Sequence, residues 1–165
     1  MERFGYDWEA HKVHTEDRYI LTTFHVLGKT GEERKEPTKG SVLIQHGDTM
    51  DGASWLESFE KGAPWLCYFK DCTPFHLLLA DQGYDVWIGN NRGTMYSWDH
   101  ETLSSADDPE YWLWSWAEMG LYDDTANISM IKQESGVDKI FYVGYSQGTI
   151  QMFYGLAHLE NSFYA

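Results

Sequence analysis

A serine stands at the centre of a Gly-x-Ser-x-Gly pattern near the end of the sequence, where residues 144–148 read Gly-Tyr-Ser-Gln-Gly. The apolar run 140–143 before the pattern predicts a buried strand, and residues 149–160 after it predict a helix. A serine on a sharp turn between a strand and a helix presents its hydroxyl at the top of a sheet. The pattern therefore predicts that Ser146 is a nucleophile on such a turn, a nucleophile elbow.

The neighbours of Ser146 fit this chemistry. Gly144 and Gly148 let the backbone turn sharply because they carry no Cβ atom. The backbone N–H of Gln147 lies at the predicted helix N-terminus, where it is free to donate to a developing oxyanion. The alternative is an ordinary strand-to-helix turn in which Ser146 caps the helix.

A catalytic serine also needs a histidine to take its proton and an acid to orient that histidine. Among the residues after Ser146, His158 is the one histidine and Glu160 the one carboxylate. His158 lies about 18 Å along the predicted helix at about 1.5 Å per residue, so it cannot reach Ser146. We therefore expect negligible turnover from these 165 residues alone.

The other histidines do not point to a metal site. His46 follows the predicted strand 41–45, which should lie beside the elbow strand. The remaining five are spread over predicted strands, helices and loops without ligand spacing: His11, His14, His25, His76 and His100. The spacing of the histidines therefore does not support a metal site.

Composition excludes several classes of function. The net charge of −14 and the pI near 4.7 argue against binding nucleic acid or anionic lipid. No stretch approaches the roughly 20 apolar residues of a membrane span, and no secretory signal is visible at the start. Cys67 and Cys72 are too few for a disulfide framework or zinc site; the alternatives are a local bridge between them and two free buried thiols, and the free thiols are the preferred interpretation. Asn127 begins a glycosylation sequon, but it falls in a predicted helix, which argues against its use.

Strands and helices alternate along the chain, which predicts one α/β domain over residues 1–165 with a mostly parallel sheet. The predicted strands are 11–14, 19–27, 41–45, 84–89 and 140–143, and the predicted helices are 54–59, 75–82, 115–134 and 149–160. In the longest helix, Ser115 and Glu118 form a capping box and Gly136 ends the helix. Its predicted apolar face is Met119, Tyr122, Ala126 and Met130.

For two further features, the aromatic run 111–116 and Arg92, a structural role is the preferred interpretation over a functional one. The aromatic run 111–116 could face lipid, but core packing at a helix entry is the preferred interpretation. Arg92 could contact a substrate, but a structural ion pair is preferred.

Several blocks together resemble the acid lipase family, which includes the gastric and lysosomal acid lipases. The blocks are residues 5–21, 45–47 (Gln-His-Gly), 79–93 (LADQGYDVWIGNNRG), 115–119 (Ser-Trp-Ala-Glu-Met) and 142–148. The resemblance implies the N-terminal half of an α/β-hydrolase fold and an ester hydrolase acting on neutral lipid esters, triacylglycerols or sterol esters, without a cofactor. By this resemblance Ser146 is the nucleophile, and the backbone N–H groups of Gln147 and Asp48 are the oxyanion donors.

The sequence departs from the family pattern in three places. The family usually has Leu where Asp48 stands and His where Tyr145 stands, and the connection 61–73 is longer than usual. Asp48 can still donate through its backbone. Its carboxylate would disfavour a developing negative charge unless it points into solvent.

The expected fold looks incomplete, because an elbow strand is normally central and here would lie at an open edge. We expect these residues to be the N-terminal half of a longer lipase, with the cap and the remaining triad members downstream. The family resemblance implies a secreted or lysosomal protein. The alternative is a lipase-like chain without activity, a binding or assembly subunit whose partner covers that edge. The elbow alone does not exclude another α/β-hydrolase activity, such as that of a peptidase or thioesterase.

Overall fold

The computed structural model describes residues 1–33, 37–57 and 73–158. Its strands are β1 (Tyr6–His14), β2 (Tyr19–Lys29), β3 (Ser41–Gln45), β4 (Asp85–Ile88), β5 (Asp99–His100) and β6 (Phe141–Gly144). Its helices are η1 (Glu2–Phe4), α1 (Ser54–Glu57), α2 (Phe75–Asp81), η3 (Pro109–Trp112), α3 (Trp116–Glu118), η4 (Met119–Asp123), α4 (Asp124–Ser135) and α5 (Gln147–His158).

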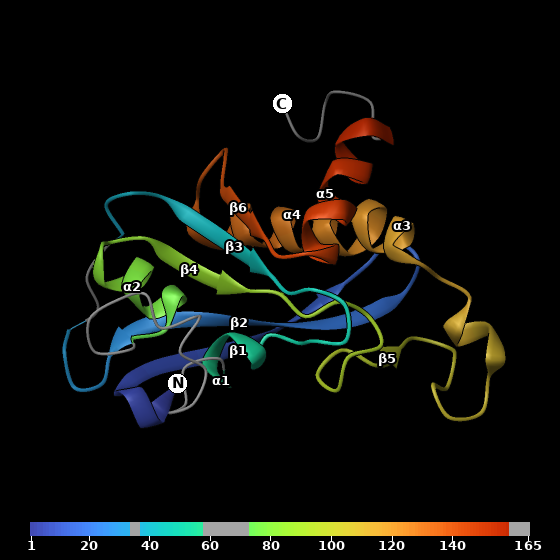
Figure 1. Cartoon of the computed structure of the whole chain (residues 1–165), viewed down its shortest axis with the longest axis horizontal. Coiled ribbons are helices and arrows are strands. Elements are labelled where there is room, and N and C mark those ends of the chain that lie inside the picture. Colours follow the sequence, from blue (N-terminus) through green and yellow to red (C-terminus); the bar gives the residue numbers. More distant parts are fainter. Residues whose placement is uncertain (34–36, 58–72, 159–165) are drawn as a thin grey trace.

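The strands form one mixed sheet in the order β1-β2-β4-β3-β6, with the short β5 pairing with β2 (Figure 1). Strands β4, β3 and β6 are parallel, whereas β1 and β2 pair antiparallel at the other side. The predicted α/β class is confirmed. Strand β1 begins earlier than predicted because its first half pairs with β2 although most of its side chains are exposed, so hydropathy does not reveal it.

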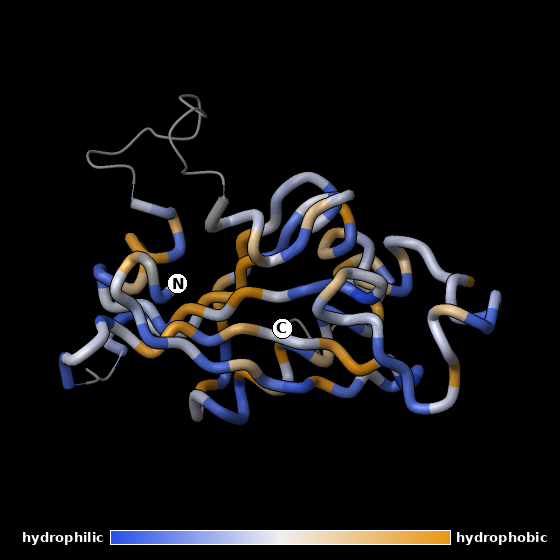
Figure 2. Tube along the Cα trace, turned by 90° about the horizontal axis from the view of Figure 1, so that it is seen from below, coloured by the Kyte–Doolittle hydropathy of each residue, from blue (hydrophilic) through white to orange (hydrophobic). Residues whose placement is uncertain are grey.

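Helices cover both faces of the sheet (Figure 1). On one face Leu77 of α2 packs with alternate residues of β3 and β4, including Val42 and Ile88. On the other face Ile131 of α4 packs with Leu43 of β3. Figure 2 shows hydrophobic residues concentrated along the neighbouring strands in the middle of the molecule. Because side chains alternate across a strand, burial on both faces produces continuous apolar runs like that of β3.

The predicted long helix is interrupted. Its capping box is present: Ser115 Oγ accepts from Ala117 N–H at 3.1 Å, and Glu118 accepts from the Ser115 N–H at 2.7 Å. A π-helical turn, η4, then separates α3 from α4. A Cβ atom at Gly120 would overlap the carbonyl oxygen of Gln151, so α5 approaches the backbone closely at this turn.

The π turn also changes which face of the helix is buried. A π turn holds more residues than an α turn. A helical period of 3.6 residues extended through η4 therefore no longer marks the most buried positions of α4. The most buried side chains of α4 are Asp124, Asn127, Ile128 and Ile131, whereas Ala126 and Met130 of the predicted face are only partly buried. The predicted face is therefore confirmed in part: Met119 is buried, and Ala126 and Met130 pack partly buried against core residues.

Asn127 of the sequon is fully buried, and its Oδ1 accepts a hydrogen bond from Thr23 Oγ1. A glycan attached to this side chain would not fit in this fold. Cys67 and Cys72 and the long connection 61–73 lie outside the described residues apart from Thr73.

The core interpretation of the aromatic run 111–116 holds for Tyr111 and in part for Trp114, which is partly buried against the same core cluster. Tyr111 is fully buried and its carbonyl accepts from Tyr19 Oη. By contrast, Trp112, Leu113 and Trp116 are 48%, 79% and 44% exposed, which corrects the expectation of core packing. Aromatic composition alone does not distinguish a core cluster from an exposed apolar surface.

The structural ion pair predicted for Arg92 is confirmed. The buried guanidinium lies 2.7 Å from the carboxylate of Asp123 and donates to Asp17 at 2.9 Å. Burial would lower the pKa of Arg92, but the charges of Asp123 and Asp17 outweigh it and raise that pKa. The pairs fasten the segment after β4 to η4 and to the turn between β1 and β2.

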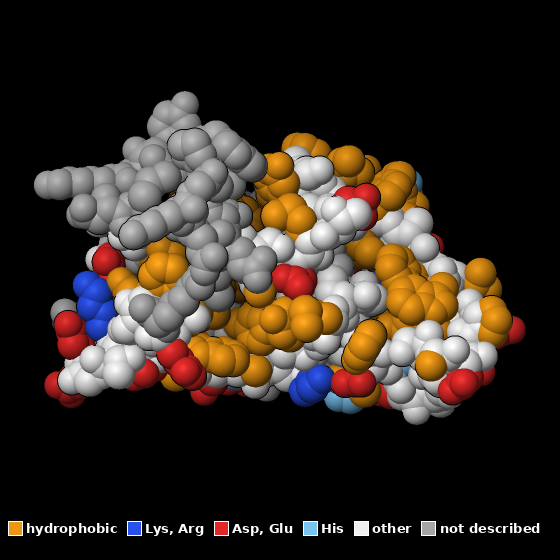
Figure 3. Space-filling view, turned by 60° about the horizontal axis from the view of Figure 1, so that its bottom comes forward, with side chains coloured by type: hydrophobic (Ala, Val, Ile, Leu, Met, Phe, Trp, Pro, Cys, Tyr) orange, Lys and Arg blue, Asp and Glu red, His pale blue; other side chains and the backbone are white. Residues whose placement is uncertain are grey.

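Strand β6 pairs with β3 and forms the edge of the sheet within residues 1–33, 37–57 and 73–158. Phe141 at its start is 57% exposed. Figure 3 shows one face of the molecule, where hydrophobic side chains gather in patches with acidic side chains between and around them. Among the helices described, none is long and apolar enough to cross a membrane.

Candidate active site

Ser146 occupies the turn between β6 and α5 and is exposed to solvent. Its φ of 50° lies in the left-handed region, which is sparsely populated by residues other than glycine. Such backbone strain is found where a structure holds a residue in place for function. The strand, sharp turn and helix expected from the sequence are all present.

Two glycines let the turn pack closely. A Cβ atom at Gly148 would lie 2.7 Å from the carbonyl oxygen of His46 and 2.8 Å from that of Gln45. A Cβ atom at Gly144 would lie 2.7 Å from the carbonyl carbon of Gly148. In addition, Tyr145 N–H donates to the Gln45 carbonyl at 3.0 Å. The elbow is thus held against the carboxyl end of β3.

The two predicted oxyanion donors belong to residues that line the same hollow. Gln147 begins α5, and among the described residues no acceptor is bonded to its backbone N–H. Asp48 follows Gly47, whose Cβ position would lie 3.1 Å from Ser146 Cβ. Its backbone N–H likewise has no acceptor within the described ranges. Two amides beside one exposed hydroxyl are the arrangement that stabilises a tetrahedral oxyanion.

The Asp48 carboxylate is exposed and accepts the backbone N–H of Thr49 at 2.9 Å. Water therefore screens its charge, and repulsion of a nearby oxyanion is correspondingly weak. The departure from leucine at this position leaves the backbone donor in place.

His46 is held in a structural role. Its Nδ1 lies 2.8 Å from the Gly47 carbonyl, and its Nε2 accepts the backbone N–H of Asn91 at 3.0 Å. Because Nε2 accepts, Nδ1 carries the proton and the ring is neutral. Burial lowers the pKa of His46, partly opposed by the bond to Gly47. Neither ring nitrogen is available to take the serine proton.

His158 lies at the end of α5, as expected. Its ring stacks on Tyr154 at 3.9 Å and its Nδ1 lies 3.0 Å from the Tyr154 carbonyl. The remaining histidines belong to β1, β2, α2 and β5. All seven histidines of the sequence lie in described segments, and none of these contacts joins one to Ser146.

A buried chain of amides beneath the elbow escaped the sequence analysis. Gln45 Nε2 donates to Asn91 Oδ1 at 2.8 Å, and Asn91 Nδ2 donates to Gln151 Oε1 at 2.9 Å. Gln151 Nε2 in turn donates to Asp124 at 2.8 Å. These bonds tie the carboxyl ends of β3 and β4 to α5 and α4. The sequence offers one indication of this hydrogen-bonded network: Gln151 is a polar residue on the buried face of the otherwise apolar helix α5.

An open hollow of about 500 Å³ has both Asp48 and Gln147, the predicted oxyanion donors, in its wall. Apolar side chains contribute much of the rest: Met50, Met95, Trp114, Trp116 and Met119. This volume is within the range of small-molecule sites. The aromatic segment corrected above therefore supplies part of an exposed apolar wall.

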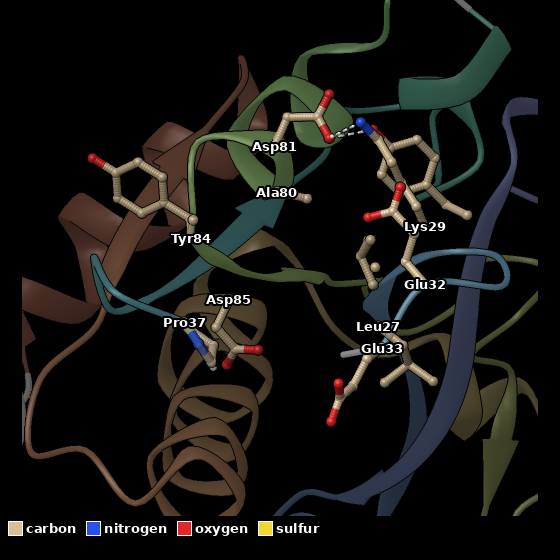
Figure 4. Close-up of a pocket in the computed structure, with 13 residues that line it drawn as sticks. Leu27, Lys29, Glu32, Glu33, Pro37, Ala80, Asp81, Tyr84 and Asp85 are labelled. Atoms are coloured by element: carbon tan, nitrogen blue, oxygen red, sulfur yellow. Dashed lines mark hydrogen bonds and ion pairs between the residues drawn. The ribbon is translucent and has the colours of Figure 1, made fainter. Parts of the chain in front are cut away.

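A second hollow, of about 320 Å³, lies at the opposite ends of the parallel strands (Figure 4). There Lys29 Nζ pairs with Asp81 at 3.1 Å, and Tyr6 Oη donates to the same carboxylate at 2.6 Å. Ligands of open α/β sheets bind outside the carboxyl ends of the strands. The elbow and its hollow are at those ends, so they form the candidate active site.

A mixed sheet with helices on both faces and a strained serine directly after a parallel strand define the class of α/β hydrolases. The comparisons agree with that class. The family model described as "alpha/beta hydrolase fold" matches residues 41–163, and one described as "Partial alpha/beta-hydrolase lipase region" matches residues 1–59. The chain belongs to the α/β-hydrolase fold family.

Its curated relatives include acid lipases, as the resemblance predicted. Lipase member K of Mus musculus is 40% identical over 146 residues, covering 88% of this chain and 34% of that protein. Human lysosomal acid lipase/cholesteryl ester hydrolase is 37% identical over 147 residues, covering 88% of this chain and 34% of that protein. The chain spans about a third of the length of these relatives.

Among solved structures, the esterase Pf2001 of Pyrococcus furiosus matches with a TM-score of 0.60 and 16% identity. The match covers 96% of this chain and 49% of the esterase. At this identity the match shows the fold alone.

Proposed function

We propose that this chain carries the nucleophile and the oxyanion donors of a lipase that hydrolyses neutral lipid esters. The observation that carries the proposal is Ser146, exposed and held at a φ of 50° between β6 and α5. The relatives named lipases support the choice of ester hydrolysis over other activities of this fold.

In this reaction Ser146 Oγ attacks the ester carbonyl carbon, and the carbonyl π electrons move to oxygen. The backbone N–H groups of Gln147 and Asp48 donate to that oxyanion. Collapse of the tetrahedral intermediate expels the alcohol, which takes up a proton, and water then releases the acid from the acyl-serine. The apolar wall formed by Met95, Trp114 and Trp116 suits the acyl chain of a lipid ester.

The serine proton needs an acceptor, and none of the chain's histidines is placed to be one. We therefore propose that the 165-residue chain alone has negligible ester turnover, although its nucleophile is formed. Ser146 has a strained backbone and lies beside the proposed oxyanion donors. It should therefore still react with a fluorophosphonate at alkaline pH, where hydroxide serves as the base.

The test is labelling of the purified chain with a fluorophosphonate at pH 9, followed by intact mass and peptide mapping. We expect one adduct on Ser146, none in Ser146→Ala, and unchanged labelling in Ser129→Ala, which alters an exposed serine on α4. Hydrolysis of p-nitrophenyl butyrate should not exceed that of Ser146→Ala. Labelling that survives in Ser146→Ala would disprove the assigned nucleophile, whereas turnover abolished by Ser146→Ala would disprove the inactivity.

The second candidate is a lipase-like chain that binds or assembles without catalysis. The position of the histidines and the exposure of Phe141 at the edge strand β6 favour it. It predicts no adduct on Ser146 even at pH 9, so the same labelling experiment separates the two functions.

A further inference from the structure

Three potential metal ligands meet on the face of the sheet that α4 covers. Glu9 and His11 are two residues apart on β1, so their side chains share a face, and His25 of β2 lies directly opposite Glu9 in the register. Glu9 Oε1 lies 3.1 Å from His11 Nε2 and 3.2 Å from His25 Nδ1. All three ligand atoms lie within 4.8 Å of one another.

Contacts with Asp85 and Trp87 fix the orientation of the His25 ring. His25 Nε2 lies 2.7 Å from Asp85 Oδ1, and the ring stacks on Trp87 with centroids 3.7 Å apart. The other oxygen of Asp85 accepts from Ser41, Ser135 and Trp87. A carboxylate with this many donors acts as an acceptor, so His25 Nε2 carries a proton and donates to it.

This arrangement leaves Nδ1 of a neutral His25 facing Glu9 Oε1 at 3.2 Å, lone pair towards lone pair. Two acceptors at that distance need a positive charge between them. A proton that converts His25 to imidazolium is one solution, and a metal ion bound by both atoms is the other. Histidines that bind metals characteristically donate their second ring N–H to a carboxylate, as His25 does to Asp85.

The spacing is compatible with a metal ion. A tetrahedral site with bonds of about 2.0–2.1 Å separates its ligand atoms by about 3.3 Å. The distances of 3.1 Å and 3.2 Å from Glu9 match that separation. An open hollow of about 350 Å³ is lined by Glu9, His11 and His25, which leaves room for a water molecule as the fourth ligand.

We propose that Glu9, His11 and His25 bind a divalent metal ion of the zinc type, with Asp85 orienting His25. Two imidazoles and one carboxylate suit zinc. The ion would fasten β1 to β2 at a place where β1 contributes mostly exposed side chains. This proposal is independent of the proposed ester hydrolysis.

The test is a Zn²⁺ titration of the metal-stripped 165-residue chain against a chromogenic chelator at pH 7.5. Cys67 and Cys72 are alkylated beforehand, because thiolates bind zinc themselves. We expect one site, with affinity reduced about tenfold or more by His11→Gln or Glu9→Gln. The matched control is His14→Gln, which alters an exposed histidine on the same strand that pairs with Glu101 instead.

Co²⁺ provides a second readout, because a tetrahedral site produces intense visible absorption that unbound Co²⁺ lacks. That absorption should be present in the parent chain and His14→Gln and absent in His11→Gln. Circular dichroism in the presence of a chelator checks that each variant is folded without metal. If His11→Gln does not fold, Glu9→Gln takes its place in the comparison. Absence of Zn²⁺ binding, or equal weakening by His14→Gln and His11→Gln, would overturn the proposal.

Discussion

Gly148→Ala tests whether close contact between α5 and β3 forms the elbow. The added Cβ would lie 2.7 Å and 2.8 Å from the carbonyl oxygens of His46 and Gln45, where ordinary contact begins at 3.4 Å. Both neighbours are backbone atoms, so no side chain can rotate away, and the two elements must separate by roughly 0.6 Å. Overpacking of this kind costs about 1–3 kcal/mol.

Alanine also favours a helix over glycine by about 0.8–1 kcal/mol, which offsets part of that cost. The expected net loss in the free energy of unfolding is therefore about 0–2 kcal/mol. For a chain of this size that corresponds to a melting temperature lower by up to about 8 °C. Separation of α5 from β3 also displaces the Gln147 N–H, so the rate of fluorophosphonate labelling at Ser146 should fall about tenfold.

Calorimetry and labelling rates of Gly148→Ala and the parent chain check both expectations. Ile150→Ala is the matched control, because Ile150 is on the same helix and is 51% exposed. It should keep the parent labelling rate. If Gly148→Ala were as stable and as reactive as the parent chain, the close approach would not be what holds the nucleophile in place.

Two further variants probe the buried charges near the site. Arg92→Met leaves the buried Asp123 without its partner and should lower the free energy of unfolding by about 3–5 kcal/mol, measured by urea denaturation; a loss below about 1 kcal/mol would contradict a buried ion pair. Burial raises the pKa of Asp124 well above its ordinary value, opposed by a hydrogen bond from Gln151 and reinforced by Asp123. A carboxyl group with a raised folded-state pKa costs stability above the unfolded-state pKa of about 3.9. Asp124→Asn should therefore melt above the parent chain at pH 7, and the difference should disappear towards pH 4; a constant difference between pH 4 and pH 7 would contradict this origin.

Local patterns predicted much of the fold and the elbow. The run 41–45 is apolar on both faces of its strand, and the residues around Ser146 contain the glycines that a sharp strand-to-helix turn requires. The capping box at Ser115 was predictable because its bonds join residues three apart. Arg92 was correctly assigned to an ion pair, although the sequence could not name Asp17 and Asp123 as its partners.

The errors arose where long-range contacts override a local period. The π turn at 119–123 shifts the helical repeat, so the predicted apolar face contains the partly buried Ala126 and Met130 but misses the fully buried Asp124 and Asn127. The exposure of Trp112 and Trp116 depends on what lies opposite them in space. Nothing in the composition of residues 111–116 reveals that.

The sequence by itself determined the α/β class, the position of Ser146 on its turn and the absence of a histidine able to reach it along α5. These depend on hydrophobic period, glycine placement and the rise of a helix, all of which are local properties. Only the tertiary structure decided that His25 stands opposite Glu9 beside His11, because strand register joins residues distant in the sequence. The same holds for the Asp48 and Gln147 amides, which two different parallel strands bring to one edge of the sheet.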